Sequence, residues 1–169
     1  MSLIHLGLTS LALVVATATA FSAEPIEIKA YDENCWVLEY SPDGKQLVTL
    51  PNKEGALKSW DSATGKLLWE TEKTGRSCAC FSPDGKVVAI GGWGKVGLYE
   101  AATGKHLRKV GESRQGVNGV AFSPDGSTMA VVFVESNIVD VIDFESGKVL
   151  HTLTAPIEKP AKGTGGVSR

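Results

Sequence analysis

The side chains that could carry catalysis are few and widely spaced in this sequence. His106 and His151 are the only histidines beyond the amino-terminal apolar segment, and they fall on two separate predicted strands. No hydrolytic triad can be assembled around either of them. Asp32 and Glu33 are adjacent carboxylates, but they lie in a connecting loop where both are expected to be solvated. The sequence therefore predicts no catalytic residue and no enzyme.

The cysteines offer little metal or redox chemistry. Cys35, Cys78 and Cys80 are an odd number beyond the first twenty residues, so they cannot all pair within one chain. Cys78 and Cys80 are two apart on a predicted strand, which places them on one face but too far apart to bridge comfortably. No histidine or second cysteine pair stands near them. We expect three small apolar side chains, no bound metal and no cofactor.

Trp93 is the first of two candidates for binding a protein partner. It stands in "GGWGK" (91–95), where the glycines expose the indole and Lys95 lies beside it. Large aromatic side chains beside a cation often anchor protein interfaces. The alternative is a tryptophan that packs across a neighbouring sheet.

Arg114 is the second candidate. It lies in "GESRQG" (111–116), which begins like a phosphate-binding loop but has Val117 where the lysine should follow, and no helix is signalled after it. We interpret the stretch as a loop between two sheets, with Arg114 available for contacts at the rim.

The overall charge excludes some partners. The chain has 17 basic and 19 acidic residues, a formal net charge of −2, and 43% of its residues are hydrophobic. A nucleic-acid or anionic-membrane binder usually needs a basic field, so we expect no nucleic-acid partner. The composition is that of an ordinary globular protein.

The first twenty residues read as a secretory signal peptide (1–20). The apolar run "LALVVATATA" (11–20) ends in small residues, which predicts cleavage after Ala20, with Ala23 as a second choice. A retained anchor is the alternative, because no Lys or Arg precedes the run. The run is, however, barely long enough to span a bilayer. We therefore expect an exported protein, periplasmic or extracellular, with no membrane span after signal removal.

One short turn recurs through the rest of the chain. It reads "YSPDG" at 40–44 and "FSPDG" at 81–85 and 122–126, at intervals of 41 residues. Serine, then proline with its fixed φ, and glycine at the end suit a type I hairpin turn, and the aspartate can bond the local backbone. A second turn ends in Gly65, Gly104 and Gly147, where positive φ is expected.

Each unit is predicted to form four antiparallel strands. The strands before and after the first turn are "CWVLEY" and "KQLVTL" in the first unit, and the next two are "ALKSWD" and the stretch after Gly65. The units cover about residues 31–71, 72–112 and 113–154, within a single region from 21 to 154. The tail 155–169 is rich in Pro, Gly and Lys, and we expect it to be disordered.

The first unit resembles a WD-repeat, with Trp60 and Asp61 as the signature dipeptide, and the third is also similar to YVTN-type repeats. This resemblance implies an all-β fold, a partial β-propeller of three four-stranded antiparallel blades. The Gly-His dipeptide of the family is missing from all three units. The family's buried His–Ser–Asp–Trp bond chain should then be absent and the blades less rigid, as in a degenerate bacterial branch.

Three blades are fewer than the roughly four to eight of a closed propeller. The segment "PIEIKAY" (25–31) is predicted to be an extra outer strand with no blade of its own to complete. Either copies of the chain associate as a homo-oligomer that completes the ring, or the chain is a piece of a longer propeller. We expect a protein-interaction module or scaffold. The alternatives are a fragment of a quinoprotein- or lactonase-like propeller enzyme, or a truncated inactive piece.

Overall fold

The computed structural model describes residues 25–32, 34–51, 55–74, 78–111, 116–134 and 138–154. These ranges contain β-strands and turns but no helix. The predicted signal peptide (1–20), the predicted tail (155–169), Glu33 and Arg114 lie outside the described residues.

The described strands form three separate four-stranded antiparallel sheets, each ordered as its strands follow in the chain. Sheet 1 contains β1 (Cys35–Tyr40), β2 (Gln46–Pro51), β3 (Gly55–Asp61) and β4 (Leu67–Thr74). Sheet 2 contains β5 (Cys78–Phe81), β6 (Val87–Gly91), β7 (Val96–Glu100) and β8 (His106–Val110). Sheet 3 contains β9 (Val117–Phe122), β10 (Thr128–Phe133), β11 (Ile138–Asp143) and β12 (Val149–Thr154). The predicted fold class, four antiparallel strands per unit, is confirmed.

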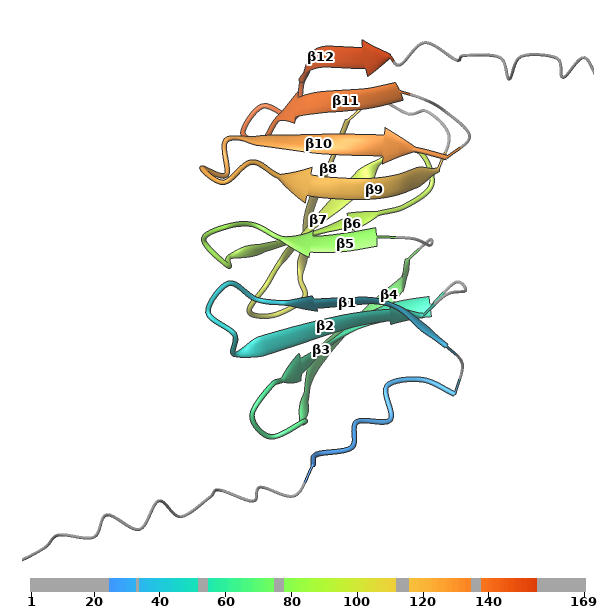
Figure 1. Ribbon diagram of the computed structural model, residues 1–169, viewed down its shortest axis with the longest axis vertical. Coiled ribbons are helices and arrows are strands. Elements are labelled where there is room, and N and C mark those ends of the chain that lie inside the picture. The colour runs from blue at the N-terminus through green and yellow to red at the C-terminus, as the bar shows by residue number, and fades with distance from the viewer. Residues whose placement is uncertain are drawn as a thin grey trace, which may run out of the picture.

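The sheets follow one another in chain order, with sheet 2 between sheets 1 and 3 (Figure 1). The contacts between sheets are concentrated at the first strand of each, where β1 adjoins β5 and β5 adjoins β9. The sheets are therefore closest at these first strands and farther apart at the last strands, β4, β8 and β12.

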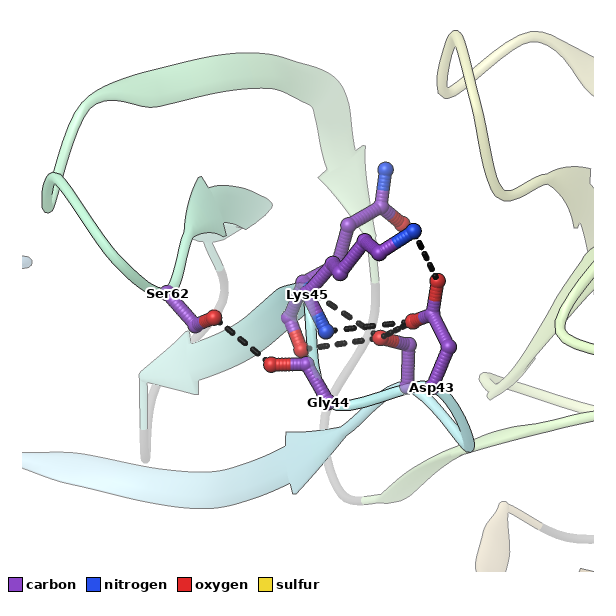
Figure 2. A network of polar contacts seen from close by, with 6 residues as sticks. Asp43, Gly44, Lys45 and Ser62 are labelled. Carbon is purple, nitrogen blue, oxygen red and sulfur yellow. Dashed lines mark hydrogen bonds and ion pairs between the residues drawn. The ribbon is translucent and has the colours of Figure 1, made fainter.

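The recurring turn is held by its own polar side chains (Figure 2). Ser41 Oγ donates to Asp43 Oδ1 at 2.7 Å and accepts from the backbone N–H of Gln46 at 2.8 Å. Asp43 Oδ1 also accepts from the N–H of Lys45 at 3.1 Å, and Gly44 has a φ of 72°. The equivalent serine and aspartate make the same contacts in sheets 2 and 3. The predicted turn chemistry is thus confirmed.

Successive turns also touch one another. A Cβ atom on Gly85 would lie 3.6 Å from Cδ of Pro42, and one on Gly126 would lie 3.6 Å from Cδ of Pro83. The proline of each turn therefore packs beside the glycine of the next. This contact between neighbouring sheets uses the same two turn positions each time.

Apolar side chains fill both junctions between sheets. We call the side of a sheet that faces the preceding sheet its leading face, and the opposite side its trailing face. The first junction buries Val48, Leu50, Leu57 and Trp69 of sheet 1 against Ala79, Phe81, Val88 and Ile90 of sheet 2. The second buries Ala89, Val96, Leu98 and Val110 of sheet 2 against Val117, Met129, Val131 and Ile142 of sheet 3. The core of the protein therefore lies between the sheets.

The segment 25–31 was predicted to form an extra outer strand, and that prediction is wrong. It has no strand pairing and lies on the leading face of sheet 1. Lys58 Nζ donates to the carbonyl oxygen of Ala30 at 2.8 Å, and the hydroxyl of Tyr31 lies 2.7 Å from the carbonyl oxygen of Thr49. Hydrogen bonds that involve the side chains of Lys58 and Tyr31 hold the segment to sheet 1.

Candidate functional site

Trp93 lies at the tip of the turn between β6 and β7 and is 75% exposed. The N–H of Gly92 donates to the carbonyl oxygen of Lys95 at 3.2 Å, which closes the turn, and Gly94 has a φ of 81°. The N–H of Val117 in turn donates to the carbonyl oxygen of Gly92 at 2.9 Å. The turn is thus fixed to sheet 3 while its indole faces solvent.

The indole does not pack across the neighbouring sheet as the alternative reading supposed. The indole lies beside Gly116, just before β9, where an added Cβ would lie 3.6 Å from the ring. On the other side, Trp93 and Lys95 line a hollow of about 250 Å³ together with Tyr99. The structure places Trp93 at the rim, exposed beside Lys95, and its role as a partner anchor stays a prediction. Arg114 lies outside the described residues, so its predicted role stays a prediction.

A second exposed surface lies on the leading face of sheet 1. Trp36, Leu38 and Tyr40 alternate along β1 and are 70%, 63% and 59% exposed. Leu38 and Tyr40 share one face because alternate residues of a strand do so, and the irregular pairing between Cys35 and Val37 interrupts this alternation at Trp36. We call these three residues the β1 stripe.

The equivalent positions in the other sheets are covered. Ala79 and Phe81 occupy the places of Leu38 and Tyr40 before the next turn, and they are 5% and 9% exposed. Both belong to the junction with sheet 1. The β1 stripe is exposed because no preceding sheet packs against it in the described part of the chain.

The outer part of the same face is covered by the segment 25–31. In sheet 1, a Cβ atom on Gly65 would lie 2.6 Å from Ile26. At the equivalent position of sheet 2, a Cβ atom on Gly104 would lie 2.5 Å from the Trp69 ring. In sheet 3, a Cβ atom on Gly147 would lie 3.1 Å from Val110. Trp69 and Val110 come from the last strand of the preceding sheet in each case. Ile26 therefore takes the place on sheet 1 that an outer strand takes on sheets 2 and 3.

A buried polar network under this segment was not predicted. Trp60 Nε1 donates to Thr49 Oγ1 at 2.9 Å, and Thr49 Oγ1 donates to the Tyr31 hydroxyl at 3.2 Å. Burial, which outweighs the bond to Thr49, raises the pKa of Tyr31. The absence of the family's own bond chain stays a prediction from the sequence. No pattern in the sequence indicated this network, because Tyr31 precedes the first repeated strand.

The aromatic residues that recur in register pack between sheets with one exception. Phe81 and Tyr99 lie at the first junction and Phe122 at the second. Trp60, which recurs in register with them, lies instead on the leading face of sheet 1, where the segment 25–31 covers it in place of a sheet. Trp69, which had no predicted role, is buried at the first junction.

The cysteines show no reactive arrangement. All three are free thiols, Cys35 exposed and the other two partly buried. Burial, with a smaller contribution from Cys78, raises the pKa of the Cys80 thiol to about 12, so this thiol stays protonated near neutral pH. Within the described ranges, no group of three His, Cys, Asp or Glu side chains could hold a metal ion. The same ranges contain no helix long and apolar enough to cross a membrane.

Comparison with known proteins identifies the repeat. A family model described as "WD domain, G-beta repeat" matches residues 104–136. An uncharacterised WD repeat-containing protein of Synechocystis is 25% identical over 142 residues, covering 82% of this chain and 40% of that protein. THO complex subunit 3 of Arabidopsis thaliana is 27% identical over 139 residues, covering 79% and 42%. These matches support a WD-repeat β-propeller family for the chain.

Similar proteins also include one much longer protein and two solved structures. Telomerase protein component 1 of Mus musculus is 29% identical over 149 residues, covering 78% of this chain and 6% of that protein. Among solved structures, U3-55K superimposes with a TM-score of 0.66 at 20% identity, covering 76% of this chain and 41% of that one. The WD40 repeats of RRP9 give a TM-score of 0.66 at 19% identity. These structures establish the propeller fold.

The WD-repeat protein spans less than half the length of each of these relatives. Where a source is given, these relatives come from a cyanobacterium, a plant and a mammal. The assignment of this chain to a degenerate bacterial branch therefore stays a prediction.

Proposed function

We propose that this WD-repeat protein is an exported, non-catalytic interaction module that holds a protein partner through the rim around Trp93. The observation that carries the proposal is the 75% exposure of Trp93 on a turn fixed by hydrogen bonds to its own sheet and to sheet 3. An exposed tryptophan on a rigid turn loses little conformational entropy on binding and buries a large area. Such residues are frequent binding anchors.

Export rests on the sequence of the first twenty residues. We propose that they are a cleaved signal peptide and that the mature chain acts outside the cytoplasm. Mass spectrometry of the protein from its native cells should find the amino terminus at Phe21 or Glu24. A mature chain that still begins at Met1 would reject export by this route.

The partner role can be tested by photo-cross-linking in the native cells. A benzophenone amino acid in place of Trp93 should give one or a few defined cross-linked proteins. The same substitution at Trp36, which is also exposed at 70%, samples the β1 stripe as a matched control. Cross-links from position 36 alone, or from neither position, would reject the rim as the partner site.

A second role follows from the β1 stripe, because the positions of Leu38 and Tyr40 are buried in sheet 2 and partly buried in sheet 3. We propose that a further sheet covers it, supplied by a second copy of the chain or by additional blades of a longer propeller. Light scattering distinguishes the two. A dimer that dissociates when Leu38 and Tyr40 are both changed to Lys supports a second copy, and a wild-type chain that remains a monomer supports additional blades.

A further inference from the structure

The outer side of the first junction carries a groove next to Trp93. Two adjoining hollows, of about 250 Å³ and about 640 Å³, share Lys73, Tyr99 and Lys109 among their lining residues. Lys73 comes from β4 of sheet 1 and Lys109 from β8 of sheet 2, so the groove follows the gap between two sheets. We call it the lysine groove. Trp93 and Lys95 line its smaller end.

The smaller end of the lysine groove lies at a position that has no side chain, Gly97. Gly97 pairs with Lys109 across the ladder, just as Lys58 pairs with Glu70 in sheet 1 and Asp140 pairs with Thr152 in sheet 3. The ring of Tyr99 lies over Gly97, and a Cβ atom there would come within 2.9 Å of the ring. Gly97 and Tyr99 thus form the floor of a hollow at this place in sheet 2.

The equivalent places in the other sheets are filled. In sheet 1 the ammonium group of Lys58 lies over the rings of Tyr31, at 4.8 Å, and Trp60, at 5.9 Å. In sheet 3 the buried Asp140 accepts a hydrogen bond of 2.7 Å from the hydroxyl of Thr152. The lysine groove is therefore a feature of sheet 2 and does not follow from the repeat itself.

The charge around the smaller end has a single sign. Lys73, Lys95 and Lys109 are exposed, and none of the three ammonium groups forms an ion pair with a described carboxylate. Unpaired like charges around one hollow attract an anion, and the aromatic walls offer it an apolar neighbour. At the larger end the lining changes sign, because Glu70 and Glu72 stand there beside His106.

We propose that the lysine groove binds an acidic polypeptide segment, whose carboxylates meet the three lysines while an apolar residue rests on Trp93. This inference rests on the proposed function and names the partner's chemistry. A nucleic acid fits less well, because a continuous phosphate backbone would meet Glu70 and Glu72 at the larger end. A peptide can place neutral or basic residues there.

Fluorescence polarisation with a labelled, end-capped octaglutamate peptide tests the proposal on the whole mature chain. Lys73→Gln and Lys109→Gln are each expected to raise the dissociation constant about threefold or more, and the double variant about tenfold or more. Lys45→Gln is the matched control, because its ammonium group lies 3.8 Å from Asp43 on a different turn. It should leave binding unchanged. Binding should also weaken as salt rises.

Equal binding by wild type and by the double variant would overturn the proposal, and so would tighter binding of octathymidylate than of octaglutamate. The result with octaglutamate can be distinguished from the result of cross-linking at position 93, which tests the proposed function. If position 93 still captures a partner while octaglutamate does not bind, the acidic ligand is rejected and the interaction module stands. If octaglutamate binds through the lysines while position 93 captures nothing, the groove stands and the partner role at Trp93 is rejected.

Discussion

Trp69 and Gly104 lock sheet 1 to sheet 2. Trp69 Nε1 donates a hydrogen bond of 2.9 Å to the carbonyl oxygen of Ala101, and a Cβ atom on Gly104 would lie 2.5 Å from the indole ring. The indole therefore needs a residue without a side chain beside it, in a turn that also needs a positive φ. One glycine satisfies both requirements.

Gly104→Ala should accordingly destabilise the protein more than a turn substitution in open space. Its φ of 72° costs about 1–2 kcal/mol for alanine, and the overlap with Trp69 adds about 1–3 kcal/mol. Gly44→Ala is the control, since Gly44 has the same φ of 72° but no atom within 4 Å of its added Cβ. Urea unfolding of the two variants measures the difference. Equal losses would show that the indole contact contributes nothing.

Tyr31→Phe should loosen the segment 25–31 without unfolding the sheets. The variant loses the hydroxyl contacts to the carbonyl oxygens of Thr49 and Ala56, at 2.7 and 2.9 Å, at a cost of about 1 kcal/mol. Amide hydrogen exchange should become faster around β3 and stay unchanged in sheet 3. Tyr40→Phe, with an exposed ring, is the control. Unchanged exchange at β3 would contradict the role of Tyr31.

We expect the folded protein to lose stability in strong acid, because its turn aspartates become protonated there. Hydrogen bonds from Ser123 and Ser127 lower the pKa of Asp125 from 3.8 to about 2. Side-chain hydrogen bonds likewise lower the pKa of the turn aspartates Asp43, Asp61, Asp84 and Asp143. A lowered folded pKa means that the unfolded chain binds protons first, so the stabilisation is complete above about pH 4 and is lost as the pH falls toward 2.

Urea unfolding at a series of pH values checks this expectation. The wild type should lose stability between about pH 4 and pH 2, and Asp125→Asn should lose less over that interval because one of the groups no longer titrates. A wild-type stability that is level across this range would contradict the turn hydrogen bonds.

The thiols should differ in reactivity with iodoacetamide near pH 8. Cys35 is exposed, whereas burial raises the pKa of Cys80 to about 12 and keeps its thiolate scarce. Mass spectrometry should find Cys35 modified first and Cys80 modified only in urea. Modification of both at one rate in the native protein would place β5 in solvent.

The turns and strands could be predicted because their causes are local. Ser41, Asp43 and Gly44 interact within five residues of one another, and the same letters recur in each unit. The strand alternation and the second-turn glycines follow in the same way. Such a pattern can be recognised within each unit without its neighbours, and the structure contains the turns and strands that it predicts.

Features that depend on a neighbour could not be predicted. The β1 stripe has the alternation of a core strand, yet Leu38 and Tyr40 are exposed because no described sheet precedes sheet 1. Trp60 fits the repeat but packs under the segment 25–31. At the candidate site, the exposure of Trp93 could be inferred from its flanking glycines. The lysine groove could not be inferred, because it joins residues of two sheets over a glycine.

The most direct test of this account compares two substitutions at equivalent positions. Tyr40 and Phe81 both precede the Ser-Pro-Asp-Gly turn, but they are 59% and 9% exposed. In urea unfolding of the monomeric chain, Tyr40→Asp should lower the free energy of unfolding by less than about 1 kcal/mol, because the ring is mostly in solvent. Phe81→Asp should lower it by more than about 4 kcal/mol or prevent folding. Equal losses at the two positions would contradict a fold in which the leading face of sheet 1 is open at Tyr40 while that of sheet 2 is covered at Phe81.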